Sequence, residues 1–427
     1  MTTTAPDGRF PPDRPAVPGL VPFDEARRIV LERIRPLPPV PLPLAEAAGC
    51  VLAEDVAAAE DIPPFANSAM DGFAVRSADL AGATPEHPTR LRLAGEVFAG
   101  TARLPLVEPG TVVRITTGAP LPPGANAVVP VEATTLDGPD VLLGMAPAER
   151  GFVRAAGEDV AAGTIVLRSG QVLEPAAIGM LASIGRPVVL AHPRPTVIVV
   201  STGDELVDPG EPLGPGQIRN SNSFMLAAQA TAAGVHAFPL GRLRDDVAAL
   251  EAGFTRAAAE GNAVITSGGV SVGEHDYTKQ VLAELGDVTP WRVAMQPGMP
   301  QAFGHAAGVP LFGLPGNPVS AFVVFEVLVR PALRKLAGYP PGRLDRPRIV
   351  ARLAEPVRSP AGKTSFLRVT LAPGPSGPLA SLTGAQGSGV LSSCVAADGL
   401  AVVPAAERGL PEGAEVEVVV LREDWGP

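Results

Sequence analysis

The chain has 427 residues, of which 34 are Lys or Arg and 44 are Asp or Glu, so its formal net charge is −10. Because 46% of the residues are hydrophobic, a disordered acidic polymer is excluded, although the chain contains 47 Gly and 49 Pro. The length predicts two to four domains, since single cores stop growing near roughly 250–300 residues. The acidic balance disfavours nucleic-acid binding, which needs a basic surface.

Cysteine content and the N-terminus bear on the cellular location. Cys50 and Cys394 are too few for a disulfide framework or a zinc site. Residues 1–19 carry no apolar h-region, so we predict a disordered tail there and no signal peptide. The most apolar run, 322–329, is interrupted by Glu326 and is far shorter than the roughly 18 residues of a membrane-spanning helix. We therefore expect a cytoplasmic protein without a membrane partner.

The first predicted helix covers residues 23–35. Ala26, Val30 and Ile34 lie on one face of it, acidic residues occupy its first turn, and a proline follows it. From about 60 to 150, short apolar runs alternate with Pro-Gly turns, as before TVVRI and ANAVVPV. This second stretch is therefore predicted to be mostly β.

Strands and helices alternate between about 195 and 340. Because the predicted strands are apolar throughout, this alternation predicts a parallel sheet with helices on both faces. After Pro347 the pattern returns to β, in the segments RIVARL, SFLRVTL, LAVVPA and EVEVVVL. The elements predicted in the central stretch are strands at 196–200 and 263–266 and helices near 223–233, at 246–260 and at 317–336.

Three glycine-rich polar segments belong to this central stretch. STGDE (201–205) follows its first predicted strand, TSGGVSVGEHD (266–276) follows its second, and LPGNPVS (314–320) opens its last helix. Ligands of open α/β sheets bind beyond the carboxyl ends of the strands. Glycines let backbone N–H groups approach an anion there, and helix N-termini add positive partial charge. One such turn alone is usually structural, but three in one module predict a phosphate-bearing ligand.

The same segments are rich in carboxylates, and two interpretations of them stay open. Asp246 would cap a helix and Asp204 would close a turn, both of which are structural roles. Carboxylates beside a phosphate also require a cation between them, and Mg²⁺ suits such a set of oxygen ligands. The carboxylates concerned are Asp204, Glu205, Asp245, Asp246, Glu274 and Asp276.

Taken in order, the polar motifs of the chain resemble those of the MoeA and gephyrin E-domain family of molybdopterin molybdenumtransferases. The resemblance covers nearly the whole chain. It rests on NSAMDGFAV (67–75), RITTGAP (114–120), GEDV (157–160), STGDEL (201–206), SGGVSVGEHDYTK (267–279) and LPGNPVS (314–320).

The resemblance implies a multidomain fold that combines α/β and β domains. A discontinuous linker domain would occupy 20–60 and 150–190, with a β domain inserted at 61–149. A central α/β molybdopterin-binding domain with a parallel-rich sheet would occupy 191–342, followed by a C-terminal β-barrel-like domain at 343–427. A homodimer is also implied, whose active site lies between the α/β domain of one subunit and the β domain of its partner. A molybdopterin adenylyltransferase is a further possible partner.

The implied reaction uses adenylylated molybdopterin and molybdate as substrates, releases AMP with the help of Mg²⁺, and leaves molybdenum on the dithiolene sulfurs. By motif match, the catalytic residues would be Asp71, Thr117, Asp159, Glu205, Asp276 and Arg292, and Glu205 and Asp276 would also bind Mg²⁺. The cofactor-binding residues would be Ser201, Thr202, Gly203, Asp245, Ser267, Gly268, Gly269, Ser271, Gly273, Gln296, Pro315, Gly316 and Asn317.

The chain departs from the family pattern at three positions. Ala66 replaces an aspartate, and Gln296 and Met299 replace lysines, whereas Arg292 retains one positive charge. These departures motivate one alternative, a catalytically weakened paralogue that binds molybdopterin or a partner protein. A second alternative is a molybdopterin adenylyltransferase, because the α/β module resembles the domain that adenylylates molybdopterin. The flanking β modules favour insertion over adenylylation.

The segment GKTSFLR (362–368) allows two interpretations. Lys363, Ser365 and Arg368 would either lie on a surface strand or contact an anion. We favour the surface strand, because Lys and Arg side chains are normally exposed.

Overall fold

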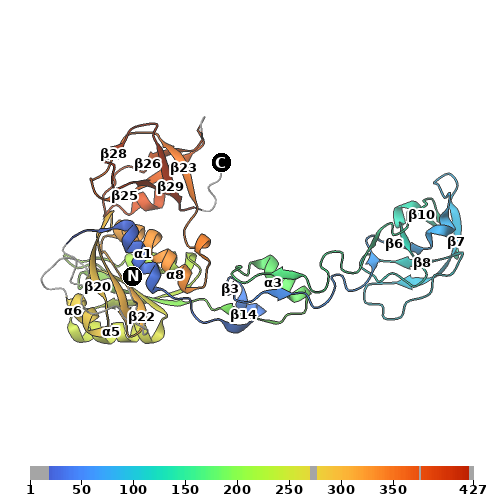
Figure 1. Cartoon of the computed structure of the whole chain (residues 1–427), viewed down its shortest axis with the longest axis horizontal. Coiled ribbons are helices and arrows are strands. Elements are labelled where there is room, and N and C mark those ends of the chain that lie inside the picture. Colours follow the sequence, from blue (N-terminus) through green and yellow to red (C-terminus); the bar gives the residue numbers. More distant parts are fainter. Residues whose placement is uncertain (1–18, 270–276, 375–376, 423–427) are drawn as a thin grey trace, which may run out of the picture. The chain divides into compact units, whose positions relative to one another are not determined.

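The computed structural model describes residues 19–269, 277–374 and 377–422 (Figure 1). The predicted tail up to residue 18 lies outside the described residues, as do the predicted site residues Ser271, Gly273 and Asp276. The chain divides into two compact units. Of the described residues, the large unit contains those up to Val40, Gly49–Val51 and those from Ala191 onward, and the small unit contains Pro41–Ala48 and Leu52–Leu190.

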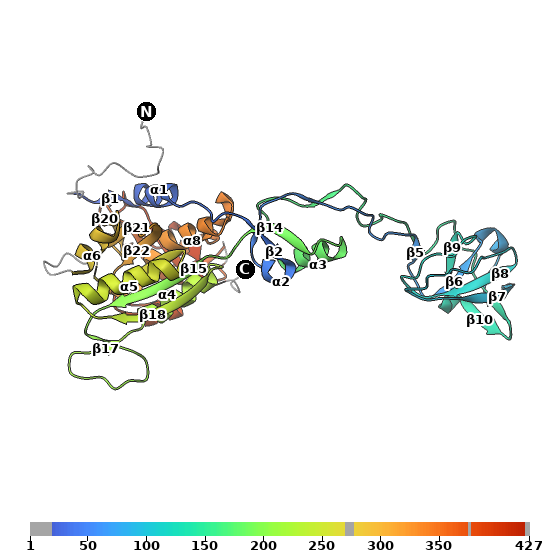
Figure 2. The same cartoon turned by 90° about the horizontal axis from the view of Figure 1, so that it is seen from below.

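A parallel sheet forms the centre of the large unit. Its strand β15 (Thr196–Thr202) pairs in parallel with β18 (His236–Leu243) and β19 (Ala263–Ser267), and β19 pairs in parallel with β22 (Val309–Leu314). Two antiparallel strands, β21 (Pro300–Ala306) and β20 (Thr289–Gln296), extend this sheet, and Figure 2 shows its strands in order from β20 to β18. The predicted parallel-rich α/β domain is thus confirmed.

Helices cover both faces of this sheet. Successive strand residues point to opposite sides, and the residues on both sides are apolar and buried by these helices. Val197 and Val199 pack on the face covered by α1 (Phe23–Arg33), α4 (Asn222–Ala232) and the helices that follow β22. Ile198 and Val200 pack on the opposite face, which α5 (Val247–Glu260) and α6 (Tyr277–Leu285) cover (Figure 1). The two hydrophobic cores of the domain therefore alternate along a single strand.

The predicted helices occur in the structure, with changes at their ends. The first ends at Arg33, two residues early, because Ile34 already has the extended conformation (φ −90°, ψ 131°). Asp246 is the N-cap of α5, and its Oδ1 accepts a hydrogen bond from the Ala249 N–H at 2.8 Å, so its structural interpretation is confirmed.

The long helix predicted at 317–336 is in fact three segments. They are α7 (Pro318–Val324), a π-helical turn η3 (Phe325–Val329) and α8 (Arg330–Leu336). Pro331 near the start of α8 has no N–H, so the regular α-helical ladder cannot continue there. In the π-helical turn, the Arg330 N–H bonds to the Phe325 carbonyl instead.

The C-terminal part of the large unit is a small closed sheet, which we call the barrel. Its strands are β25, β26, β23, β29 and β27 in order of pairing, and β27 pairs back onto β25. This closure confirms the predicted barrel-like domain. The barrel joins the central sheet where β25 pairs with β20, at Met295 with Thr364 and Gln296 with Ser365. The strands cover Arg348–Leu353 (β23), Thr364–Ala372 (β25), Leu379–Leu382 (β26), Gly399–Val403 (β27) and Glu415–Val420 (β29).

The small unit contains a six-stranded sheet, as the alternation of apolar runs and Pro-Gly turns predicts. Its strands in order of pairing are β10 (Thr134–Asp137), β11 (Asp140–Leu143), β7 (Thr89–Val97), β8 (Thr111–Ile115), β6 (Gly72–Val75) and β9 (Ala127–Pro130). None of the helices within the described ranges is both long and apolar enough to span a membrane.

The remaining elements are short. The helices are α2 (Leu44–Ala47), α3 (Pro175–Ser183), α9 (Ser392–Ala396) and the 3₁₀ turns η1 (Ser77–Leu80), η2 (Val131–Ala133) and η4 (Pro341–Arg343). The strands are β1 (Val21–Pro22), β2 (Val40–Pro43), β3 (Val51–Leu52), β4 (Val56–Ala57), β5 (Asn67–Ser68), β12 (Val153–Arg154), β13 (Ile165–Leu167), β14 (Val188–His192), β16 (Leu206–Val207), β17 (Ile218–Arg219), β24 (Val357–Arg358) and β28 (Gly409–Leu410).

Candidate functional site

The carboxyl ends of β15, β19 and β22 open into one cavity of about 1040 Å³, which we call the large cavity. Adjacent parallel strands end at the same edge of a sheet, so the loops that follow them meet there. Each of the three glycine-rich segments contributes to the wall. The predicted site residues that line it are Ser201, Thr202, Gly203, Glu205, Asp245, Ser267, Gly268, Gly269, Pro315, Gly316 and Asn317.

Two glycines of this wall have conformations that other residues adopt at a cost. Gly268 has a φ of +95°, and a Cβ atom placed on it would lie 2.7 Å from the Thr202 carbonyl oxygen. Gly269 has a φ of +64°, and a Cβ atom there would lie 2.3 Å from the Thr278 hydroxyl oxygen. The backbone of the loop after β19 therefore lies so close to Thr202 and Thr278 that no side chain fits between them, and the shape of the loop depends on both glycines.

Asn222, the first residue of α4, links the loops of the cavity and was not predicted from the sequence. Its Nδ2 donates to the Ser267 Oγ at 2.7 Å and to the Gly316 carbonyl at 2.8 Å. Its Oδ1 is buried and has no hydrogen-bond partner among the described residues. The polar residues 220–223, where the apolar helix α4 begins, indicate a polar role at this position but not the partners of Asn222.

The barrel also supplies part of the wall of the large cavity. Gly389 and Leu391 line it. The preceding residue, Ser388, accepts hydrogen bonds from the Asn317 Nδ2 at its Oγ (3.1 Å) and from the Val319 N–H at its carbonyl (3.1 Å). We call residues 388–391 the barrel wall. The cavity is thus completed by a domain that follows the α/β domain in the chain.

The carboxylates of the large cavity are exposed to solvent. Glu205 is exposed, and its carboxylate lies against the Cα of Gly203, where a side chain would clash with it. Asp204 lies in a turn closed by the bond from the Leu206 N–H to the Gly203 carbonyl at 3.2 Å. No group of three or more His, Cys, Asp or Glu residues within the described ranges is arranged to hold a metal ion. Mg²⁺ commonly uses one or two carboxylates together with substrate phosphates, and the Glu205 carboxylate at the large cavity is of the kind that this ion takes.

A second, small cavity of about 190 Å³ lies where the barrel meets the α/β domain. Gln296, Arg358, Ser365, Arg368 and Gln386 contribute to its lining. Gln296 therefore lies in a different cavity from the other described cofactor-binding residues. Arg292, predicted to be catalytic, is exposed on β20 and lines neither cavity.

Arg368 is a buried cation, which corrects the interpretation of its segment as a surface strand. It is 1% exposed, as is Ser365, because β25 pairs with strands on both sides. Its Nε donates to the Ser393 Oγ at 3.2 Å and its Nη2 to the Gly387 carbonyl at 3.4 Å. Burial lowers the pKa of the Arg368 guanidinium. In the described part of the chain, its hydrogen-bond acceptors are thus neutral oxygens, so an anion in the small cavity would supply the missing negative charge.

The predicted residues of the small unit form a separate group. The Asp71 Oδ1 accepts hydrogen bonds from the Thr117 N–H at 2.7 Å and from the Thr117 hydroxyl at 2.9 Å. These two bonds, the backbone one foremost, lower the pKa of Asp71, and the charge of Arg114 contributes in the same direction. Asp159 is exposed, and its N–H donates to the Ile62 carbonyl at 3.0 Å. Asp71 and Thr117 are thus in direct contact.

Replacing Thr117 with valine is expected to raise the pKa of Asp71 but to leave it below its ordinary value. The substitution removes the hydroxyl donor and retains the backbone N–H. A carboxyl group whose pKa is lower in the folded than in the unfolded state stabilises the folded state at pH values above its unfolded-state pKa. This stabilisation is lost as the pH falls through the pKa of the folded state. Because the folded-state pKa of Asp71 is higher in the variant, the stabilising contribution of Asp71 is lost at a higher pH. Carboxyl-detected NMR titration measures the shift.

Thr111→Val is the matched control for this titration, because the Thr111 hydroxyl donates to the backbone carbonyl of Glu108 and not to a carboxylate. It should leave the pKa of Asp71 unchanged. An unaltered pKa in the Thr117 variant would show that the hydroxyl contributes nothing.

The chain matches three family models that follow one another along it. The MoeA N-terminal region (domain I and II) matches residues 21–185, a probable molybdopterin binding domain matches 198–335, and the MoeA C-terminal region (domain IV) matches 350–421.

Individual proteins are similar over most of the chain. A molybdopterin molybdenumtransferase 2 of Mycobacterium tuberculosis (strain H37Rv) is 46% identical over 353 residues, which cover 81% of this chain and 87% of that protein. A molybdopterin molybdenumtransferase of Haemophilus influenzae is 42% identical, with 74% and 78% covered. The crystal structure of the molybdopterin biosynthesis protein moeA from Pyrococcus horikoshii OT3 superposes with a TM-score of 0.75 at 29% identity, covering 94% of this chain and all of that one. The predicted multidomain fold is confirmed, whereas the predicted domain limits stay predictions.

Proposed function

The chain belongs to the MoeA family of molybdopterin molybdenumtransferases, which act in molybdenum cofactor biosynthesis, and we propose on this premise that it inserts molybdenum from molybdate into adenylylated molybdopterin and releases AMP. The observation that carries the proposal is the large cavity. Three glycine-rich loops and the carboxylate of Glu205 meet there, and its volume of about 1040 Å³ suits a ligand with a pterin, two phosphates and a nucleoside.

The residues of the large cavity suit the parts of such a ligand. The backbone N–H groups around Gly268 and Gly269 and the N-terminus of α4 would bind phosphate oxygens. The buried Asn222 Oδ1 lacks a donor among the described residues, and a ligand N–H near the loops would provide one. These interactions would hold the phosphoanhydride bond, which is cleaved when AMP leaves, close to the carboxyl ends of the strands.

We propose that Mg²⁺ binds to Glu205 and to Asp276, which lies outside the described residues. The exposure of Glu205 at the rim of the large cavity supports this, because Mg²⁺ retains water and takes further ligands from substrate phosphates. When bound, the ion would neutralise the charge of the phosphoanhydride and of the leaving AMP.

The small cavity is our candidate site for molybdate, which is a dianion. The Arg368 guanidinium is buried there beside Arg358 and Gln296, and a charge-assisted bond is roughly twice as strong as a neutral one. Gln386 lines the small cavity, whereas Gly389 and Leu391 line the large one. The segment between β26 and β27 therefore contributes to both cavities. Arg368 would compensate for the neutral Gln296, which favours an active enzyme over a weakened paralogue.

The partner predictions extend this proposal. We propose a cytoplasmic homodimer in which the small unit of a second copy offers Asp71 and Thr117 to the large cavity. We further propose that a molybdopterin adenylyltransferase delivers the substrate.

The proposal is tested by incubating the purified protein with adenylylated molybdopterin, molybdate and Mg²⁺. AMP release is measured by chromatography, and inserted molybdenum is measured by reactivation of a cofactor-free molybdoenzyme. Glu205→Gln removes one charged ligand and is expected to slow AMP release by roughly 100-fold. The control is Glu211→Gln, since Glu211 is exposed near the same loop but does not line the cavity.

Three results would contradict the proposal. Tight substrate binding without AMP release would indicate the weakened paralogue. In a parallel incubation with molybdopterin, ATP and Mg²⁺, consumption of ATP with formation of adenylylated molybdopterin would indicate an adenylyltransferase. Equal rates of AMP release in the Glu205 and Glu211 variants would show that Glu205 takes no part in the reaction.

A further inference from the structure

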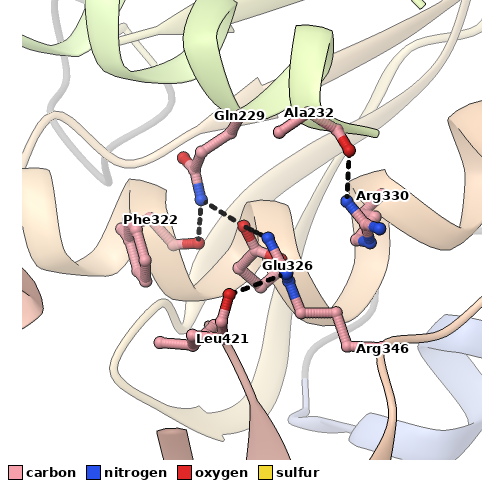
Figure 3. Close-up of polar contacts among 7 residues, drawn as sticks. All are labelled: Gln229, Ala232, Phe322, Glu326, Arg330, Arg346 and Leu421. Atoms are coloured by element: carbon pink, nitrogen blue, oxygen red, sulfur yellow. Dashed lines mark hydrogen bonds and ion pairs between the residues drawn. The ribbon is translucent and has the colours of Figure 1, made fainter. Parts of the chain in front are cut away.

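Glu326 is a buried carboxylate that lies outside both cavities. It belongs to the π-helical turn η3, and its side chain is 1% exposed. The Arg346 Nε donates to its Oε2 at 2.5 Å and the Arg346 Nη2 to its Oε1 at 3.4 Å, so the contact has a fixed orientation (Figure 3). Taking a charge out of water in this way is costly, and the partner is therefore essential to it.

The same carboxylate is held from a second side by α4. The Gln229 Nε2 donates to the Glu326 Oε1 at 2.8 Å and to the Phe322 carbonyl at 3.3 Å (Figure 3). Gln229 and Glu326 both belong to the α/β domain, whereas Arg346 lies between α8 and the first barrel strand β23. The carboxylate therefore connects the α/β domain with the chain segment that leads into the barrel.

Arg346 also binds the other end of the barrel. Its Nη1 donates to the carbonyl of Leu421 at 2.9 Å, and Leu421 directly follows the last strand, β29 (Figure 3). The residues that enter and leave the barrel are thus fastened to one carboxylate through a single guanidinium. Rotation of the barrel about either end alone is restrained.

Apolar contacts also hold the barrel but leave its angle less defined. The rings of Phe23 and Phe366 lie 5.1 Å apart, and Cys394, Leu400 and Val419 of the barrel belong to the core of the α/β domain. Hydrophobic burial is non-directional, whereas a guanidinium–carboxylate pair has a defined geometry. The ion pair is therefore suited to set the angle between the two parts, while the apolar core supplies most of the attraction.

We propose that Glu326 and Arg346 are positioning residues that set the angle of the barrel and thereby the place of the barrel wall in the large cavity. The wall contacts Asn317 and Val319 of the α/β domain through Ser388, so a small rotation of the barrel lengthens these bonds. The consequence for the substrate rests on the proposed function of the large cavity.

The test compares a variant that removes the Glu326 carboxylate with a variant that removes only its hydrogen bond from α4. Glu326→Gln keeps the shape of the side chain and removes the charge that Arg346 binds. It is expected to speed hydrogen exchange of the Val319 amide and of the barrel wall by about tenfold. It is also expected to raise the KM for adenylylated molybdopterin about fivefold, with kcat within about twofold.

Gln229→Met is the matched control. It removes the α4 bond to Glu326 and leaves the ion pair with Arg346 in place, so it should destabilise the α/β domain without changing exchange in the barrel wall. Arg346→Lys, which keeps the charge and loses the forked geometry, should behave like Glu326→Gln and provides a second variant if that one folds poorly.

If Gln229→Met speeds hydrogen exchange of the barrel wall as much as Glu326→Gln does, the proposal is overturned, because both substitutions would then act through local packing. Unchanged exchange and KM in the Glu326 and Arg346 variants would overturn it as well. Hydrogen exchange is measured on the protein without substrate. If the wild-type protein releases no AMP, the proposed function fails while the exchange experiment still decides the role of the ion pair.

Discussion

Replacing Arg368 with methionine is expected to lower kcat/KM for molybdate-dependent insertion by roughly 100-fold, which corresponds to about 2.7 kcal/mol. The guanidinium is buried beside the small cavity, and its hydrogen-bond acceptors among the described residues are neutral oxygens. Removing it would deprive a bound oxyanion of its buried positive charge, and bonds to charged groups each contribute about 1.5–3 kcal/mol. Steady-state kinetics at varied molybdate concentration measures the loss.

The same variant should not lose stability, which sets it apart from most core substitutions. A buried charge without a counter-ion disfavours folding, and methionine has a similar length without that charge. The Ser393 hydroxyl keeps its bond to the Val390 carbonyl at 2.6 Å, so it is not left unsatisfied. We expect the free energy of unfolding in denaturant to stay the same or to rise.

Arg348→Met is the control for this experiment, because Arg348 forms an exposed ion pair with Glu417 in the same barrel and lines neither cavity. Exposed pairs contribute little, so both activity and stability should stay near wild type. A loss of several kcal/mol of stability in the Arg368 variant would mean that the guanidinium is structural. Full activity in the Arg368 variant would show that the Arg368 guanidinium does not bind the oxyanion.

Replacing Gly268 with alanine is expected to weaken the binding of adenylylated molybdopterin at least tenfold, or about 1.4 kcal/mol. Its φ of +95° is unfavourable for alanine by about 1–2 kcal/mol. In addition, the new Cβ would lie 2.7 Å from the Thr202 carbonyl oxygen, so the loop after β19 must shift away from β15. Both strands end at the large cavity, and the shift would change the positions of its backbone N–H groups. Calorimetric titration measures the dissociation constant.

Gly216→Ala separates the two effects. Gly216 has a φ of +75°, so it carries the same kind of backbone strain, but no atom lies within 4 Å of its Cβ position and it does not line the cavity. It should lower the melting temperature and leave the dissociation constant within about twofold. Equal weakening by both variants would mean that general destabilisation, and not the shape of the loop, limits binding.

The features that the sequence predicts well are local in the chain. Asp246 as a helix cap and the strands around 196–200 and 263–266 depend on residues close to one another, and the structure contains each of them. The three glycine-rich segments meet because strands of a parallel sheet end at one edge, which is a general property of the fold class.

The features that the sequence did not reveal depend on contacts distant in the chain. Asn222 bonds to residues 45 and 94 positions away, and nothing in its immediate surroundings indicates those partners. Arg368 is buried because β25 pairs with the barrel strands β26 and β27 on its two sides, so the rule that arginine is exposed fails there. The π-helical turn at Glu326 is hidden for a different reason, since its apolar pattern resembles that of an ordinary helix.

The pairing of β20 with β25 bears on how the protein can be divided. One sheet runs from the α/β domain into the barrel, and Phe366, Leu400 and Val419 of the barrel are buried in the core of the α/β domain. A fragment that ends before β23 would leave the end of β20 without its neighbour and would expose an apolar surface beside it. Unpaired strand ends of this kind favour aggregation. The C-terminal segment is therefore a separate region in sequence, but in this structure its sheet and its core are continuous with those of the α/β domain.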